Sequence, residues 1–303
     1  MSMALLFPGQ GAQHAQMLPW LDDEPHASAT LARLCAVVGP DWRARLHDTT
    51  WRSENRIAQP LLTAIGIAAW QCLAHRLPAP AMVAGYSVGE LAAFASAGVF
   101  DAATAITLAI DRALLMSDGV RGSDTGLLAV QGHGARALAE ARADVAVAIR
   151  ITGDRMVVGG ASSALDVACT EWMAAGLRCT RLPVQLASHT PWMASAATAF
   201  ALRLSSVPLR APQAAVACNA DGAATRDPRT LERALSAQIA SPVRWDECMD
   251  TIAERRIRCV LEVGPSATLA SMWRERHPEI PVRSTDEFRS PDAIARWVAQ
   301  SVA

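Results

Sequence analysis

Aromatic side chains are scarce in this sequence, and no charge of one sign dominates it. Phe, Trp and Tyr together make up 5% of the 303 residues, with a single tyrosine. Surfaces that bind single-stranded nucleic acid stack bases on aromatic rings, so the composition argues against that function. The 28 basic and 29 acidic residues nearly cancel, and no basic run follows the chain. No overall field would attract nucleic acid or an anionic membrane, so partners must be recognised by local patches.

Long hydrophobic runs and closely spaced cysteines are also absent. No window reaches the roughly 20 apolar residues that span a bilayer. The apolar run at 4–7 is broken by Pro8 and Gly9, which makes it too short for a signal peptide. The seven cysteines include no C-x-x-C pair, so neither a zinc site nor a disulfide framework is expected. We predict a cytoplasmic, free-standing protein with reduced thiols, without a metal, and with neither a membrane nor a nucleic acid as partner.

Hydrophobic residues make up 51% of the chain, and their spacing alternates between strands and helices. A strand at 4–7 runs into a Gly-rich turn, and a second strand at 81–85 runs into another. Such turns lie at the carboxyl edge of an open α/β sheet, where ligands bind. The other elements expected in this part are helices at 60–76, at 88–97 before Gly98, and at 102–117 after the capping residue Asp101.

The pattern changes after the loop at 119–125. Short elements follow in the order βαββαβ, which is typical of a ferredoxin-like domain. The strands are expected at 126–131, 145–151, 155–159 and 178–186, and the helices at 134–142 and 162–175. We therefore predict that 124–187 is a small domain inserted into an α/β core made of 1–123 and 188–303. The core resumes with helices at 190–204, 228–239 and 244–256 and with strands near 214–218 and at 259–263.

The segment Gly85-Tyr86-Ser87-Val88-Gly89 matches the G-x-S-x-G pattern between an apolar strand and a helix. In that context the pattern places a serine hydroxyl on a sharp turn above the sheet edge. The free N–H groups of the following helix point to the same place. The Val88 amide would donate to an oxyanion, which contributes about 2.7–4 kcal/mol to a transition state. The alternative is a Gly-rich turn without chemistry, because the bare pattern is common by chance.

A serine nucleophile needs a base, and the chain has seven histidines. His189 lies between a predicted strand and a predicted helix, where a loop can project it over the sheet edge. His14 is the second candidate, because it follows the first Gly-rich turn. Taken alone, a histidine at such a junction is more often a polar surface residue.

The predicted helix at 102–117 is nearly apolar, and within 102–116 its only charged residues are Asp111 and Arg112. Adjacent helical positions point about 100° apart, so these two side chains do not pair well. A guanidinium near an apolar wall is a good receptor for a substrate carboxylate, because its fork binds both oxygens. The wall here would include Leu114 and Leu115. The alternative is an ordinary ion pair with an acidic residue elsewhere.

Together these features resemble the malonyl-CoA:acyl-carrier-protein transacylase family, which includes the acyltransferase domains of polyketide and fatty acid synthases. The resemblance extends along nearly the whole chain. It rests on Phe7-Pro-Gly-Gln-Gly-Ala-Gln13, Gly85-Tyr-Ser-Val-Gly-Glu-Leu-Ala-Ala93, Arg112, Ser188-His189, Gln238-Ile-Ala-Ser-Pro-Val-Arg-Trp245 and Leu261-Glu-Val-Gly-Pro265. It implies a hydrolase-like α/β core with a parallel sheet and a ferredoxin-like inserted domain.

The resemblance also implies a role for each matching residue. Ser87 would carry the acyl group, and His189 would act as general base and then as general acid. Arg112 would hold the malonyl carboxylate. The backbone amides of Gln10 and Val88 would hold the oxyanion. Malonyl-CoA would be the substrate, and a phosphopantetheine-type thiol on an acyl carrier protein would be the acceptor.

A further matching position, Gln238, would orient the histidine largely through its main-chain carbonyl. The family has a Ser–His dyad without an essential acidic third member. The resemblance implies no permanently bound cofactor. Two positions depart from the pattern. Tyr86 stands where many members have His, and the small Ser188 does not exclude a branched acyl group. A methyl group is worth only about 1–3 kcal/mol of discrimination, so malonyl and methylmalonyl both remain open.

The chain is also similar to the malonyl-transfer (epsilon) subunit of bacterial malonate decarboxylases, through 187–191 and 284–290. Three other functions remain open. The first is a serine thioesterase or hydrolase of acyl-CoA, which shares the turn around Ser87 but needs neither Arg112 nor the Gln10 loop. The second is a fatty-acid or polyketide acyltransferase for a branched malonyl unit. The third is a non-catalytic docking subunit that keeps the fold.

Overall fold

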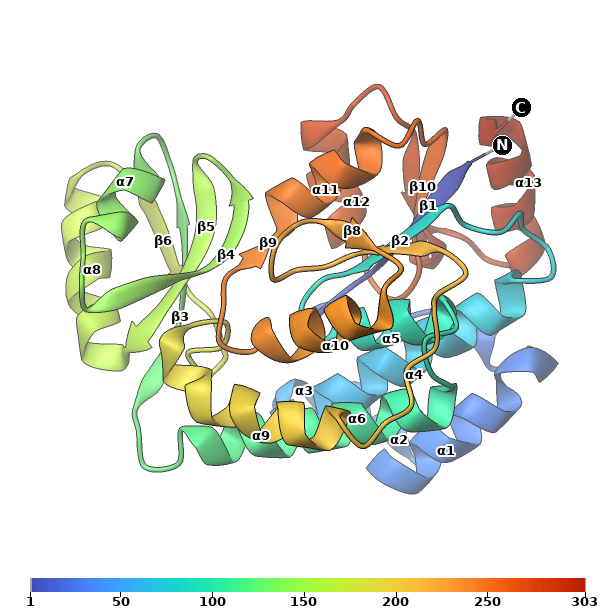
Figure 1. The fold of residues 1–303 in the computed structure, drawn as a ribbon, viewed down its shortest axis with the longest axis horizontal. Coiled ribbons are helices and arrows are strands. Elements are labelled where there is room, and N and C mark those ends of the chain that lie inside the picture. Colours follow the sequence, from blue (N-terminus) through green and yellow to red (C-terminus); the bar gives the residue numbers. More distant parts are fainter. Residues whose placement is uncertain (1, 303) are drawn as a thin grey trace.

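The computed structural model describes residues 2–302, and within them a six-stranded sheet forms the centre of the large domain (Figure 1). The strand order is β11-β10-β1-β2-β7-β8. All neighbours are parallel except β7 and β8. The strands are β1 (Met3–Phe7), β2 (Met82–Gly85), β7 (Ala215–Ala217), β8 (Ala224–Thr225), β10 (Cys259–Glu262) and β11 (Val282–Ser284). The predicted α/β core with a parallel sheet is confirmed.

Helices cover both faces of this sheet, and the alternation of side chains along β1 shows why. Met3, Leu5 and Phe7 point into one apolar cluster, and Ala4 and Leu6 point into another. The first cluster takes in α1 (Ser28–Val38), α4 (Asn55–Leu73), α5 (Gly89–Ser96), α6 (Ala102–Gly119), α9 (Ala194–Leu204), α10 (Pro228–Ala237) and α13 (Pro291–Val302). The second takes in α11 (Trp245–Ala253) and α12 (Thr268–Arg276). Two short helices, α2 (Trp42–Arg45) and α3 (Thr49–Ser53), precede α4.

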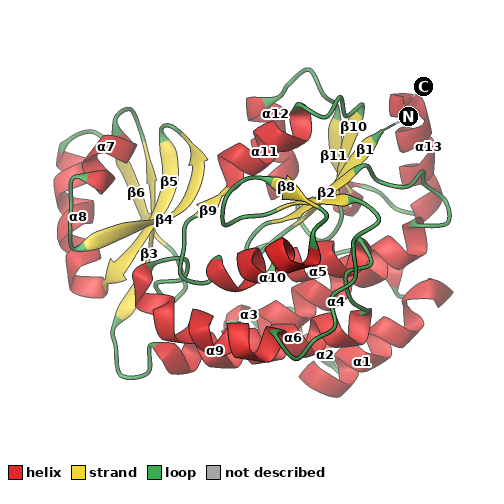
Figure 2. Ribbon diagram, in the orientation of Figure 1, coloured by secondary structure: helices red, strands yellow, loops and turns green. Residues whose placement is uncertain are grey.

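The small domain lies at one end of the molecule (Figure 2). Its strands are β3 (Thr125–Gln131), β4 (Val145–Thr152), β5 (Arg155–Ala161) and β6 (Arg178–Arg181), with α7 (Ala135–Glu140) and α8 (Ser162–Ala174) between them. The strand order β6-β3-β5-β4 is antiparallel throughout, and with the helix order it makes a ferredoxin-like sheet.

A fifth strand joins this small sheet from outside 124–187. The two residues of β9, Val243–Arg244, pair in parallel with Ile149 and Arg150 of β4. The inner face of the small sheet, including Ile149 and Ile151, belongs to the same apolar cluster as α11 and α12. The two domains therefore share a core as well as a sheet edge.

Several predicted boundaries are wrong. The helix expected at 60–76 begins at Asn55, with Pro60 inside it. The strand expected at 178–186 ends at Arg181, because the chain then turns through Pro183, which has no N–H for a ladder. The helix expected at 190–204 starts at Ala194, after a 3₁₀ turn. Within residues 2–302, no helix has the length and apolar character to cross a bilayer.

Glu262 at the end of β10 gives a test of core electrostatics. It is fully buried, and one carboxyl oxygen accepts the Ala270 N–H at 2.8 Å. Burial raises the pKa of Glu262 from 4.5 to about 8. The folded state therefore keeps a proton that the unfolded chain loses above pH 4.5. This contribution to stability is complete below that pH and is lost progressively as the pH rises to about 8.

We expect Glu262→Gln to remove this loss. The slope of unfolding free energy against pH should become less negative by up to about 1.4 kcal/mol per pH unit between pH 5 and 8. Denaturant unfolding at several pH values measures the slope. An unchanged slope in a folded variant would show that Glu262 does not hold the extra proton.

Candidate active site

The chain makes a sharp turn between β2 and α5, and Ser87 lies on it with φ of 56°. Two glycines make this turn possible. A Cβ on Gly85 would lie 2.0 Å from the carbonyl carbon of Gly89, and one on Gly89 would lie 2.2 Å from the Phe7 oxygen. Real Cβ atoms do not approach that closely, so the spacing of the G-x-S-x-G pattern has a steric cause. The turn presents Ser87 at the carboxyl end of the sheet.

His189 reaches Ser87 from the loop between β6 and α9. Ser87 Oγ lies 2.7 Å from His189 Nε2, and His189 Nδ1 lies 2.5 Å from the main-chain oxygen of Gln238. A carbonyl oxygen only accepts, so Nδ1 carries the proton and Nε2 is free to accept from the serine hydroxyl. The backbone of His189 is held as well, because its N–H donates to Ile239 O at 2.9 Å.

The imidazole is neutral in this environment. Burial, and secondly the positive charge of Arg112, lower the pKa of His189 to about 3. The hydrogen bond to Gln238 acts in the opposite direction. A neutral imidazole whose accepting nitrogen faces a hydroxyl has the arrangement of a general base.

The second basic side chain of the site is Arg112 of α6, which is 1% exposed. Its Nη1 donates to Gln59 Oε1 at 2.7 Å, and its Nη2 donates to Gln238 Oε1 at 3.2 Å and to Ser87 Oγ at 3.4 Å. Within residues 2–302 these partners are amide and hydroxyl oxygens, and Nε has none. The ion pair considered as an alternative is therefore not formed among the described residues.

The guanidinium keeps its charge in this setting. Burial lowers the pKa of Arg112 to about 10, and the neighbouring Glu90 opposes the shift. The expected apolar wall is only partly present, because Leu114 is 50% exposed on the other side of the helix. A buried cation beside a nucleophile, balanced by no carboxylate in contact, is suited to bind an anionic group of a substrate.

The two backbone amides expected to hold an oxyanion are available. Among residues 2–302, no acceptor is found for the N–H of Gln10 or of Val88. The Gln10 side chain donates to Ser53 O at 3.2 Å, which fixes the loop that follows β1. Val88 stands at the start of α5, so its N–H lies at the positive end of that helix.

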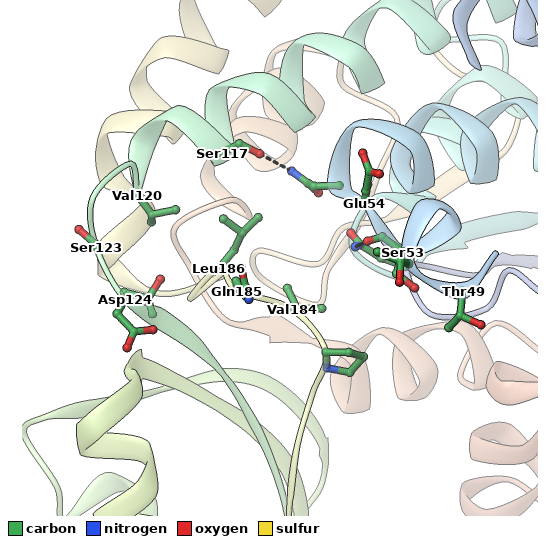
Figure 3. A pocket seen from close by; sticks show the side chains of 15 residues that line it. Thr49, Ser53, Glu54, Ser117, Val120, Ser123, Asp124, Val184, Gln185 and Leu186 are labelled. Carbon is green, nitrogen blue, oxygen red and sulfur yellow. Dashed lines mark hydrogen bonds between the residues drawn. The ribbon is translucent and has the colours of Figure 1, made fainter. Parts of the chain in front are cut away.

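Two cavities lie between the large and the small domain, and Gln10 lines both. The larger has a volume of about 730 Å³ and extends between the Ser53–Glu54 side and the Ser123–Asp124 side (Figure 3). The smaller, of about 400 Å³, is lined by Tyr86 and, from the small domain, by Arg155 and Arg178. Gln10 and Tyr86 thus bring the two clefts next to the turn, although Ser87, His189 and Arg112 line neither of them.

The other candidate base, His14, has a different partner. Its Nε2 lies 2.5 Å from the Asp286 carboxylate, which also accepts the N–H groups of Leu18 and Ser266 at 2.8 Å. The structure thus places His14 in a network with the C-terminal segment, while His189 occupies the position next to Ser87.

Three polar residues around the site were not predicted from the sequence. Gln59 accepts from Arg112, Asn219 contacts the turn on both sides of Tyr86, and Glu90 contacts Asn219. Gln238 was expected to act largely through its main-chain carbonyl, but its side chain also accepts from Arg112 and donates to Ser87 O at 3.3 Å. The only available signal was polarity in an apolar context, such as Gln59 in a helix otherwise rich in Leu, Ile and Ala.

Comparison with known proteins identifies the family. Residues 4–288 match the family described as the acyl transferase domain. The malonyl CoA-acyl carrier protein transacylase of Mycobacterium tuberculosis is 33% identical over 302 residues, which covers 97% of this chain and 99% of that protein. The protein of the same name from Escherichia coli is 30% identical over 284 residues, covering 89% and 91%.

Solved structures agree. An acyl carrier protein S-malonyltransferase from Vibrio cholerae superposes with a TM-score of 0.89 at 31% identity, covering 97% of this chain and 100% of that one. A malonyl-transacylase in complex with a type II PKS acyl-carrier protein superposes with a TM-score of 0.89 at 26% identity, covering 99% of each chain. Because the family model matches most of the chain and a relative at 33% identity covers 97% of it, this chain belongs to the malonyl-CoA:acyl-carrier-protein transacylase family.

Proposed function

We propose that this protein is an acyl-carrier-protein S-malonyltransferase, which moves a malonyl group from malonyl-CoA to the thiol of an acyl carrier protein through an ester on Ser87. The observation that carries the choice of malonyl is the buried Arg112, whose Nη2 lies 3.4 Å from Ser87 Oγ. An acyl group bound to Ser87 with a free carboxylate at its far end would place that carboxylate near the guanidinium. An acetyl group would leave the buried cation unpaired.

The reaction proceeds in two half-reactions. His189 Nε2 takes the proton of Ser87 Oγ while Oγ attacks the thioester carbonyl. The N–H groups of Gln10 and Val88 stabilise the oxyanion. The resulting imidazolium keeps its Nδ1–H bond to the Gln238 carbonyl and returns the Nε2 proton to the CoA sulfur as the C–S bond breaks. The carrier thiol then attacks the ester, and the same groups act in reverse order.

Arg112 also affects the base. Its charge is the second cause of the low pKa of His189, so a malonyl carboxylate that pairs with the guanidinium would raise the pKa of the imidazole. The base would thus become stronger when a dicarboxylic acyl group is in place. This coupling favours malonyl over acetyl in addition to the direct contact.

A mass measurement tests the proposed function. The protein is incubated with a panel of acyl-CoAs, with and without an acyl carrier protein. We expect a malonyl adduct on Ser87, transfer of that adduct to the carrier, and little free malonate. If free malonate forms as fast as the carrier is charged, the protein is a hydrolase. A wholly unmodified protein would instead support the docking function.

The pathway and the cellular location are part of this proposal. The relatives compared above carry the transacylase name, so the malonate decarboxylase subunit remains a prediction from two short segments. The seven cysteines are free thiols, in keeping with our prediction of a cytoplasmic enzyme that meets its carrier and malonyl-CoA there.

A further inference from the structure

The edge of the sheet next to Ser87 is completed by a side chain rather than by a strand. The ladder between β2 and β7 ends at the pair Ala84 and Ala217. Beyond it, Asn219 Oδ1 accepts the Ser87 N–H at 2.7 Å, and Asn219 Nδ2 donates to Gly85 O at 2.7 Å. The carboxamide thus offers one acceptor and one donor where a further peptide group of β7 would have done so.

The turn is held from its other side as well. Tyr86 N donates to Phe7 O of β1 at 2.9 Å. Gly85, Tyr86 and Ser87 therefore each have a main-chain group fixed by an element outside the turn. Ser87 has a positive φ, a conformation that non-glycine residues keep only where surrounding contacts impose it.

Asn219 is itself immobilised. It is fully buried, its N–H donates to Glu90 Oε1 at 2.6 Å, and its main-chain oxygen accepts the Arg244 N–H at 2.9 Å. Each of its four polar groups therefore has a partner. Glu90 lies in the first turn of α5, so the residue that clamps the turn is held by the helix that follows the turn.

From these contacts we propose that Asn219 is a positioning residue for acylation, with Glu90 as its support. The inference rests on the proposed role of Ser87. Asn219 touches no substrate. It fixes the backbone that carries both Ser87 Oγ and the adjoining N–H of Val88, so the nucleophile and one oxyanion donor keep their places relative to His189.

The main test is Asn219→Ala. The variant leaves the Ser87 N–H and Gly85 O without their partner. We expect acylation at saturating malonyl-CoA to slow by roughly 100-fold, the cost typical of a misplaced reacting group. The malonyl-CoA concentration for half-maximal rate should change by less than about twofold, because the contacts of Arg112 are intact. Rapid-quench intact mass measures both quantities.

A second reagent separates this inference from the proposed function. A fluorophosphonate reacts with an activated serine without using Arg112. Wild-type protein that reacts with the fluorophosphonate but not with malonyl-CoA would overturn the malonyl proposal. The role of Asn219 would then be tested by the fluorophosphonate rate of Asn219→Ala. A folded Asn219→Ala protein that reacts with both reagents at wild-type rates would overturn the role of Asn219. An unchanged rate at saturating malonyl-CoA, with only the concentration for half-maximal rate increased, would overturn it as well.

Glu90 and Glu262 provide a matched pair in case Asn219→Ala does not fold. Both carboxyls are fully buried, and through one oxygen Glu90 accepts the Asn219 N–H and Glu262 accepts the Ala270 N–H. In each, the other oxygen has no partner among the described residues. Only Glu90 contacts Asn219. We expect Glu90→Ala to slow acylation at least tenfold and Glu90→Gln, which keeps the accepting oxygen, to restore it.

The control is Glu262→Ala, which should lower the melting temperature while the acylation rate of the folded fraction stays within about twofold of wild type. Equal acylation rates for Glu90→Ala and Glu262→Ala would show that the contact between Glu90 and Asn219 has no part in positioning Ser87. Failure of Glu90→Gln to recover the rate would show that the accepted hydrogen bond is not what matters.

Discussion

Ser87→Ala protein is expected to gain no malonyl group from malonyl-CoA, and its rate of carrier charging should fall by at least roughly 1,000-fold. Ser87 Oγ is the atom 2.7 Å from the accepting nitrogen of His189, and alanine offers nothing to acylate. Direct attack of the carrier thiol on malonyl-CoA would be the only remaining route, without the covalent intermediate that divides the reaction into two easier steps. Intact mass of the protein and of the carrier measures both effects.

Ser96→Ala is the matched control. Ser96 lies on α5, the helix that follows Ser87, and its hydroxyl has no hydrogen-bond partner among the described residues. This variant should acylate at the wild-type rate, and both variants should melt within a few degrees of wild type. A malonyl adduct of undiminished yield on the Ser87→Ala protein would place the acyl group on a different residue.

Arg112→Ala is expected to separate malonyl from acetyl. Losing a buried charged hydrogen bond costs about 3 kcal/mol, so malonyl transfer should fall roughly 100-fold. Acetyl transfer should stay within about threefold of wild type, because acetyl has no carboxylate for the guanidinium to bind. The ratio of kcat/KM for malonyl-CoA and acetyl-CoA measures this directly. An equal loss with both substrates would remove Arg112 from the role of carboxylate receptor.

The same variant should alter the pH profile. The Arg112 charge is the second cause of the low pKa of His189, after burial. Without it the pKa rises, but it stays below 6.5 because the imidazole remains buried. The acid limb of acetyl transfer should therefore move to higher pH. Arg121→Ala is the control, since Arg121 follows the end of the same helix and its side chain is 82% exposed.

The parts of the site that sequence reasoning found are those fixed by local sterics. Gly85 and Gly89 surround Ser87 at the spacing that the turn requires, and the apolar strand before it and the helix after it are both recognisable. Asp101 accepts the Thr104 N–H at 2.7 Å, as its place before the helix predicted. His189 was found because a loop at the end of a strand commonly carries functional side chains.

The missed parts depend on partners far away in the chain. Asn219 meets Ser87 across 132 positions, and Gln59 meets Arg112 across 53. No periodicity within one segment encodes such a meeting, because it depends on strand order and register. The two-residue strand β9 is likewise too short for an alternation to show, so its pairing with β4 emerges only when both sheets are assembled.

The pairing of β9 with β4 has a consequence for protein engineering. Excising 124–187 as a transplantable module would strip Val243 and Arg244 of their neighbours and expose the apolar residues that contact the small sheet, such as Trp245. A shortened enzyme of that kind should aggregate instead of surviving as a minimal core. Chimeras between relatives should exchange β9 together with the insertion, because β9 and β4 pair in one sheet.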